Sequence, residues 1–138
     1  MPLHRHMLRK LLRGRRGVAA VELAIAAPVF ILLLMAVIDF GRAIDQTIRL
    51  ENAARAGAQY GLVFPDDTAG IEARVRNALA GWSDVTPTAP LTCECASPGA
   101  PCTASCARIL TVSVTRPFTA AFFVTVTTLS ANVVLRIA

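Results

Sequence analysis

Residues 18–38 read VAAVELAIAAPVFILLLMAVI, a run of 21 residues with a single charge, Glu22. As an α-helix this run would be about 32 Å long, which matches the hydrocarbon core of a bilayer. A helix that is apolar on every side must be buried on every side, and a chain of 138 residues is too short to bury one in a soluble core. The sequence therefore predicts one transmembrane helix over residues 18–38, with a kink at Pro28.

The charges on either side of this run predict its orientation. Six of the fourteen basic residues precede Gly17, and no acidic residue does: Arg5, Arg9, Lys10, Arg13, Arg15 and Arg16. Because positive flanks stay in the cytoplasm, the N-terminus is expected there and the C-terminal part outside. The run is longer than the roughly 7–15 apolar residues of a secretory signal, and no small-x-small cleavage site follows it. It is therefore expected to remain as an anchor.

The residues at the start of the run form a recognisable pattern. Gly17 follows the basic leader, the apolar run starts at Val18, and Glu22 is its fifth residue. This pattern resembles a type IV prepilin processing site. The resemblance implies that a prepilin peptidase removes residues 1–17 by cutting between Gly17 and Val18, and that the new amino group of Val18 pairs with Glu22 of an adjacent subunit.

Glu22 by itself has two interpretations. A carboxylate at the centre of a bilayer costs about 2.5–3.5 kcal/mol, and Glu22 lies only one turn into the run. It either reaches the headgroups or pairs with a positive group on a neighbouring subunit.

The helix is predicted to continue outside the membrane over residues 39–62, which contain no proline. Phe40, Ile44 and Ile48 recur every four residues and form an apolar stripe. Small residues recur at the same spacing further on, at Ala53, Gly57 and Gly61, and permit close approach of another helix. Together with Gly41, these residues are a candidate helix-packing face. The face either packs on the protein's own outer domain or contacts neighbouring subunits.

At this point the chain resembles a known family. Residues 16–24 read RGVAAVELA, Pro28 follows, residues 39–42 read DFGR, and residues 52–58 read NAARAGA. These runs look like the TadE-like family over residues 14–60, with a weaker likeness at residues 129–136. TadE-like proteins are minor pilins or pseudopilins of the Tad/Flp (tight-adherence) pilus system. TadG-like relatives have a much larger outer part, whereas TadF-like pseudopilins are a closer rival.

The resemblance implies a function and a location. It implies a role in Tad/Flp pilus assembly and surface attachment, through association with other pilin-like subunits and with the inner-membrane machinery of the pilus. It places the chain in the bacterial inner membrane or in the pilus itself. The alternative is a single-pass anchor that does not assemble and whose outer domain binds an envelope partner.

The remaining residues, 63–138, are expected to form a small outer domain. Pro65 ends the long helix, and the Asp and Thr residues after it supply N-caps for the next one. The spacing of Ile71, Val75, Leu79 and Trp82 predicts a short amphipathic helix over residues 70–81, with Gly81 near its end. Residues 83–107 contain four prolines and are predicted to be a turn-rich linker.

Four cysteines lie in this linker: Cys93, Cys95, Cys102 and Cys106. Outside the cytoplasm disulfides persist, so two disulfides are expected rather than a zinc site, whose usual C-x2-C spacing is missing. A Cys93–Cys95 bond would close a very short, strained ring. A nested and a crossed pairing of the remaining choices stay open.

The end of the chain has the periodicity of β-strands. Leu110, Val112 and Val114 alternate with Thr and Ser, which predicts a half-buried strand over residues 108–116. Residues 127–137 are predicted to be the last strand, and residues 122–127 a loop or a short strand. The expected fold is α+β and pilin-like: a long helix, a short second helix, and a small antiparallel sheet packed on the long helix.

The composition argues against catalysis. After removal of residues 1–17 the chain would hold no histidine and no lysine, and it has no Gly-rich phosphate loop. No enzyme activity, cofactor or metal is expected. Nucleic-acid binding is also not expected, because the net positive charge is confined to the leader and aromatic residues make up only 6% of the chain. The bilayer is the expected non-protein partner.

Overall fold

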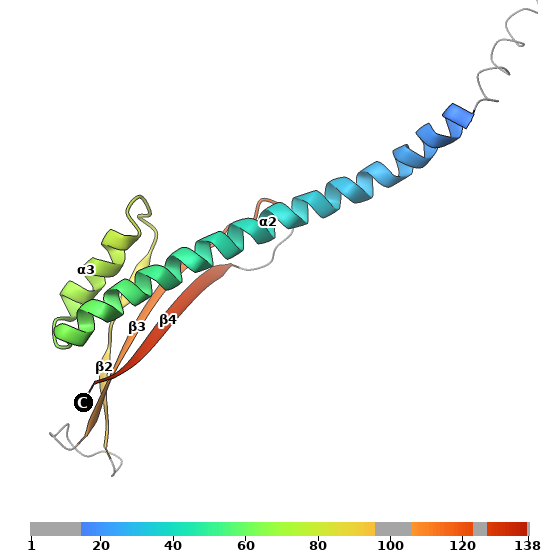
Figure 1. The fold of residues 1–138 in the computed structure, drawn as a ribbon. Helices are drawn as coiled ribbons and strands as arrows, with labels where there is room; N and C mark the ends of the chain where they lie inside the picture. The colour runs from blue at the N-terminus through green and yellow to red at the C-terminus, as the bar shows by residue number, and fades with distance from the viewer. Residues whose placement is uncertain (1–14, 96–105, 123–126, 138) are drawn as a thin grey trace, which may run out of the picture.

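The computed structural model describes residues 15–95, 106–122 and 127–137 (Figure 1). The predicted leader up to residue 14, Cys102, and most of the apolar stretch predicted as a loop or short strand lie outside the described residues. Within them, a long helix is followed by a short helix and an antiparallel sheet. The predicted α+β fold is confirmed.

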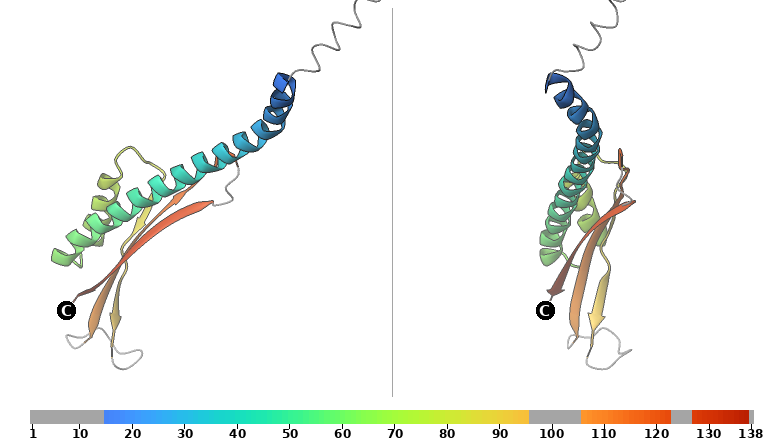
Figure 2. Two further views of the ribbon diagram at one scale, coloured as in Figure 1. Left: turned by 45° about the vertical axis from the view of Figure 1, so that its right-hand side comes forward. Right: turned by 90° about the vertical axis from the view of Figure 1, so that its right-hand side faces the viewer.

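Helix α2 (Arg15–Val63) is a single helix of 49 residues. It contains both the apolar run and the segment beyond it, and no turn separates the two. Among the described residues, α2 is the one helix that is long and apolar enough to cross a membrane. It ends at Val63 because a proline at position 65 disfavours helical geometry at residue 64. Pro28 lies inside the helix, whose N-terminal part curves without a break (Figure 2).

Helix α3 (Thr68–Ala78) folds back beside the end of α2. Its N-cap is Asp67, whose carboxylate accepts a hydrogen bond from the Gly70 amide at 2.9 Å. The sequence predicts a helix over residues 70–81, and α3 ends three residues before the end of that range. At its end the Leu79 amide donates a hydrogen bond to the Arg76 carbonyl, which tightens the last turn. Gly81, with a positive φ of 97°, lies in the turn that follows.

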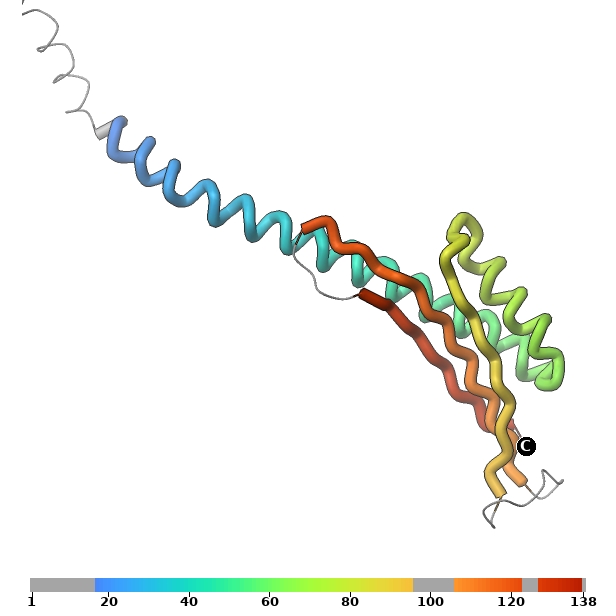
Figure 3. The backbone as a smooth tube through the Cα atoms, turned by 180° about the vertical axis from the view of Figure 1, so that it is seen from behind, coloured from blue at the N-terminus to red at the C-terminus, as the bar shows by residue number. Residues whose placement is uncertain are grey.

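The sheet is built around strand β3 (Ala107–Pro117), which pairs with β4 (Thr128–Ile137) along one side. On its other side β3 pairs first with β2 (Leu91–Glu94) and then with β1 (Thr86–Thr88). All pairings are antiparallel, and β1 and β2 follow one another along a single edge (Figure 3). The prediction of strands near residues 108–116 and 127–137 is confirmed.

The prediction of a turn-rich linker over residues 83–107 is wrong at β1 and β2. Pro87 lies within β1, where a missing amide is tolerated because an edge strand leaves one side of its backbone unpaired. Pro90 lies between the two strands, and its carbonyl accepts a hydrogen bond from the Thr111 amide at 3.0 Å. The prolines indicate turns, but pairing with β3 stabilises two short strands at this place.

The core lies between the two helices and one face of the sheet. Its fully buried large side chains come from α2, α3 and β3: Leu50, Ile71, Val75, Leu110, Val112 and Val114. Both helices lie on the same side of the sheet (Figure 2), with α2 over β3 and β4. The sheet therefore packs on the part of α2 beyond the apolar run, as the sequence predicts.

Candidate functional site

The most apolar part of α2 is not buried by the rest of the described chain. No atom outside the helix lies within 4 Å of the place where a side chain would start at Gly17, and Val18 and Glu22 are exposed. The Val, Leu, Ile and Phe side chains from Val18 to Ile38 are between 51% and 71% exposed, and Met35 among them is partly buried. Such a surface is stable only in an apolar environment, so this helix fits a single-pass membrane protein.

The structure brings Val18 and Glu22 onto one face of α2, four residues apart. A cleavage site at Gly17 would therefore place a new amino group one helical turn from the carboxylate on the same subunit. Both groups face away from the domain's core and are open to a neighbouring molecule.

The candidate helix-packing face divides into two parts. Ala53, Gly57 and Gly61 are buried against the protein's own α3 and β3. Phe40, Ile44 and Ile48, which we call the Phe40 stripe, are 63%, 55% and 53% exposed. Gly41 beside them also has open space around it. The small residues therefore serve the domain's own core, and the Phe40 stripe is left uncovered.

Asp39 is a site residue that the sequence does not reveal. It follows the apolar run directly and reads as a solvated flanking charge, yet it is completely buried. Its carboxylate oxygens accept hydrogen bonds from the backbone amides of Ala121 and Phe122, each at 2.9 Å. These two amides belong to the segment that follows β3, which is thereby held against α2. Because the partners are 82 and 83 residues away, no local pattern predicts this contact.

A second cluster surrounds Trp82, after the end of α3. The Arg116 guanidinium lies 3.9 Å from the centre of the Trp82 ring, and that of Arg49 lies at 5.8 Å. Arg116 also donates from Nε to both oxygens of Asp84, at 2.9 and 3.0 Å, and from a terminal nitrogen to Gln46 at 3.2 Å. The hydrogen bond from Arg116 lowers the pKa of Asp84. The cluster joins α2, β3 and the turn after α3.

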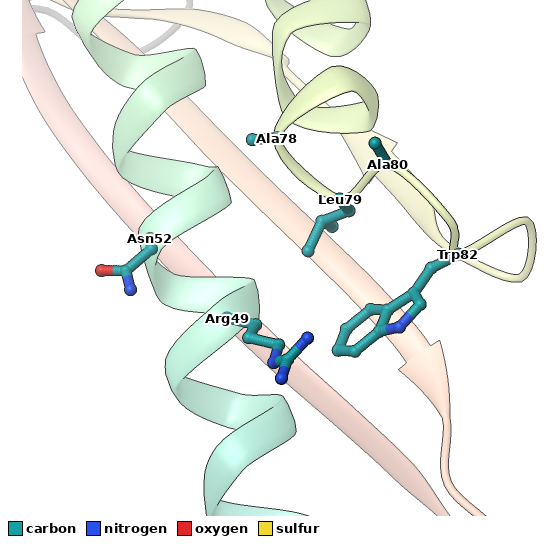
Figure 4. A pocket seen from close by; sticks show the side chains of 6 residues that line it. All are labelled: Arg49, Asn52, Ala78, Leu79, Ala80 and Trp82. Carbon is teal, nitrogen blue, oxygen red and sulfur yellow. The ribbon is translucent and has the colours of Figure 1, made fainter.

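An open pocket of about 270 Å³ lies beside this cluster, between α2 and the end of α3 (Figure 4). It is lined by Arg49, Asn52, Ala78, Leu79, Ala80 and Trp82. Arg49 already pairs with Asp45 at 3.0 Å, and the lining offers no nucleophile and no carboxylate. Within residues 15–95, 106–122 and 127–137, no group of three or more His, Cys, Asp and Glu side chains is placed to hold a metal ion.

Cys95 and Cys106 form a disulfide that closes the connection between β2 and β3. Cys93 is disulfide-bonded as well. The Cys95–Cys106 bond excludes the nested pairing, in which Cys95 would bond to Cys102.

One comparison with known proteins matches most of α2. The family described as TadE-like protein matches residues 17–59, a segment that begins at the predicted cleavage site. It contains the apolar run, Asp39, the Phe40 stripe and the first core residues of α2. No curated protein and no solved structure matches the chain. The resemblance predicted from the sequence is confirmed over residues 17–59, where the chain is similar to the TadE-like family.

Proposed function

We propose that this protein is a minor pilin or pseudopilin that takes part in the assembly of Tad/Flp pili. The TadE-like match implies a pilin-like role associated with the Tad pilus. The observation that carries the proposal is that the matched segment, residues 17–59, includes the exposed apolar run and the exposed Phe40 stripe of α2. A helix of this kind associates with other helices in a membrane or a fibre.

The first step of the proposed function is removal of the leader. A prepilin peptidase cuts between Gly17 and Val18, on the cytoplasmic side of the inner membrane, where the basic residues hold the leader. Glycine suits the cleavage position because it readily adopts the extended backbone that a protease binds. The exposure of Gly17 and its lack of neighbouring atoms support access by an enzyme.

Glu22 then directs association with the next subunit. An isolated carboxylate in a bilayer is costly, and the cost is offset when an opposite charge lies beside it. The amino group created at Val18 supplies that charge from an adjacent subunit. The exposure of Glu22 supports a pairing between molecules.

The Phe40 stripe supports an assembling subunit over a non-assembling anchor. Its three side chains lie beyond the 21-residue run, so the hydrocarbon core does not cover them, and the protein's own domain leaves each more than half exposed. Burial of one such side chain contributes about 1.5–3 kcal/mol. A neighbouring pilin-like helix that covered all three would gain several kcal/mol of association free energy.

The N-terminal residue of the protein, isolated from the bacterium that makes it, tests the first step. The proposal expects Val18 at the N-terminus and a mass reduced by residues 1–17. A chain that keeps Met1 in cells with an active prepilin peptidase would contradict it.

A Glu22→Ala variant tests the second step. We expect it to insert and to be cleaved, yet to be missing from sheared pilus fractions. The matched control is Glu51→Ala, which removes an exposed glutamate from the same helix and should leave assembly unchanged. Equal recovery of Glu22→Ala and wild type in the pilus fraction would rule out the carboxylate's role in assembly.

A further inference from the structure

Besides α2, the domain has an exposed aromatic side chain close to the end of the apolar run. Phe122, in the connection between β3 and β4, is 49% exposed, and its neighbour Ala121 is exposed too. On α2, the exposed side chain of Phe40 follows directly after Asp39, the residue that binds this connection. The sheet therefore presents an aromatic side chain beside the point where the apolar run ends.

Asp39 fixes the position of this connection. It is the first charged residue after Ile38, and its carboxylate holds the amides of Ala121 and Phe122 at 2.9 Å. A side chain of this length and one hydrogen bond place the bound amides within roughly 6 Å of the Asp39 Cα. The headgroup region on each side of a bilayer is roughly 5–7 Å thick. If residues 18–38 span the hydrocarbon, Phe122 therefore lies at headgroup depth.

The hydrogen bonds to Asp39 also satisfy two backbone amides that would otherwise be costly to place in an apolar environment. A backbone amide that enters the hydrocarbon boundary without a partner costs several kcal/mol, because lipid tails offer no acceptor. Asp39 provides acceptors for two consecutive amides and is itself completely buried. The exposed ring of Phe122 and the satisfied backbone behind it are the two properties that an interfacial contact needs.

We propose that Ala121 and Phe122 form a second contact with the membrane, in which the Phe122 ring enters the headgroup region beside α2 and Asp39 sets its depth. The occupant of this surface is lipid. The inference rests on the proposed single-pass topology and goes beyond it, because a lone helix would leave the domain free to tilt on the membrane. With two contacts, the sheet is held at one orientation to the bilayer.

Depth-dependent fluorescence quenching tests the proposal with the full chain in liposomes of phosphatidylethanolamine and phosphatidylglycerol, some brominated near the headgroup end of the acyl chain. Trp82 is the only natural tryptophan, so wild type gives the background. Phe122→Trp should add a component that these lipids quench roughly threefold or more above the control. The matched control is Val134→Trp, a site that is 59% exposed, further along β4.

A third variant separates failure of this inference from failure of the proposed topology. Phe30→Trp places a tryptophan within the apolar run, where lipids brominated deep in the chain should quench it strongly. If Phe30→Trp is quenched and Phe122→Trp is quenched no more than Val134→Trp, the second contact is overturned and the span stands. If Phe30→Trp is not quenched, the span and the second contact fail together.

Two further outcomes bear on the occupant and on Asp39. Shielding of Phe122→Trp from aqueous iodide without quenching by brominated lipid would assign the surface to a protein neighbour and overturn the proposal. Adding Asp39→Asn to Phe122→Trp should at least halve the lipid quenching, because the Asn amide can accept from one backbone N–H and opposes the other. Unchanged quenching in that double variant would overturn the role of Asp39.

Discussion

Gly57 of α2 lies so close to Val75 of α3 that a Cβ built on the glycine would be 2.5 Å from Val75 Cγ2. The same Cβ would be 3.2 Å from Val112 Cγ1 on β3. Val75 is β-branched and fully buried, so it has little freedom to move away. The distance between the long helix and the rest of the domain is thus limited to what a glycine allows.

A Gly57→Ala substitution should lower the free energy of unfolding of the domain by roughly 1–2 kcal/mol, since overpacking outweighs the gain in helix propensity. Thermal unfolding of the full chain in detergent, followed by Trp82 fluorescence, measures the effect. The matched control is Gly41→Ala, a helical glycine with no atom within 4 Å of the new Cβ. It should leave stability unchanged or raise it by up to about 1 kcal/mol. Equal effects of the two substitutions would contradict the packing argument.

Removal of the Arg116 cation should loosen the junction around Trp82. Arg116→Gln loses the guanidinium 3.9 Å from the ring and the charged hydrogen bonds to Asp84. We expect a loss of about 1–2 kcal/mol and a shift of Trp82 emission to longer wavelength as water reaches the ring. Arg136→Gln, at an exposed position on β4, is the control. An unchanged emission maximum in Arg116→Gln would show that the cation is not over the ring in solution.

The stability of the domain should fall in acid. The hydrogen bond from Arg116 lowers the pKa of Asp84, and the Gly70 amide together with the Tyr60 hydroxyl lowers that of Asp67. Because both carboxyls hold a proton less tightly when folded than when unfolded, their contribution is present above the unfolded pKa, about 3.9, and is lost as the pH falls through the lowered values.

Melting temperatures measured between pH 7 and pH 2.5 should therefore be level above about pH 5 and decline below about pH 4. Asp84→Asn should start lower and decline less, since it has already lost one of the two contributions. A wild-type melting temperature that rises on acidification would contradict the sign of both pKa shifts.

Loss of the Cys95–Cys106 disulfide should destabilise the sheet at its distal end. The bond joins residues 11 apart, and closure of a loop of that size in the unfolded chain is worth roughly 3 kcal/mol in the ideal entropic case. A Cys95→Ala, Cys106→Ala double variant should lower the urea midpoint accordingly. Fully reduced wild type should fall at least as far, because Cys93 is disulfide-bonded too. A double variant as stable as oxidised wild type would show that the Cys95–Cys106 bond does not stabilise the domain.

The parts of the fold that the sequence predicts are those with a local period. In the long helix, in α3 and in strands β3 and β4, apolar residues recur at a regular spacing that is visible within the segment's own sequence. Strands β1 and β2 escape prediction because they are three and four residues long, contain or adjoin a proline, and are stabilised by pairing with β3. The β3 residues that pair with β1 lie 25–29 positions later in the sequence, and those that pair with β2 lie 13–19 positions later.

The candidate site divides in the same way. Gly17, Val18 and Glu22 form a linear pattern, so sequence alone indicates them, and their roles stay predictions. The burial of Asp39 and the stacking of Arg116 on Trp82 depend on residues 82 and 34 positions away, and on a fold that no single segment encodes. The exposed Phe40 stripe and the buried Gly57 have the same four-residue spacing, and only the packing of the domain distinguishes them.

The absence of any turn within α2 has a mechanical consequence. The apolar run and the core-forming part of the domain are one helix over residues 15–63, so force applied at one end is carried to the other without a hinge. Drawing the helix out of the bilayer by one turn would lift the sheet by about 5.4 Å, and rotating it would swing the distal disulfide through the same angle. A displacement of the membrane end of α2 would therefore move the sheet with it, since no loop between them can absorb the motion.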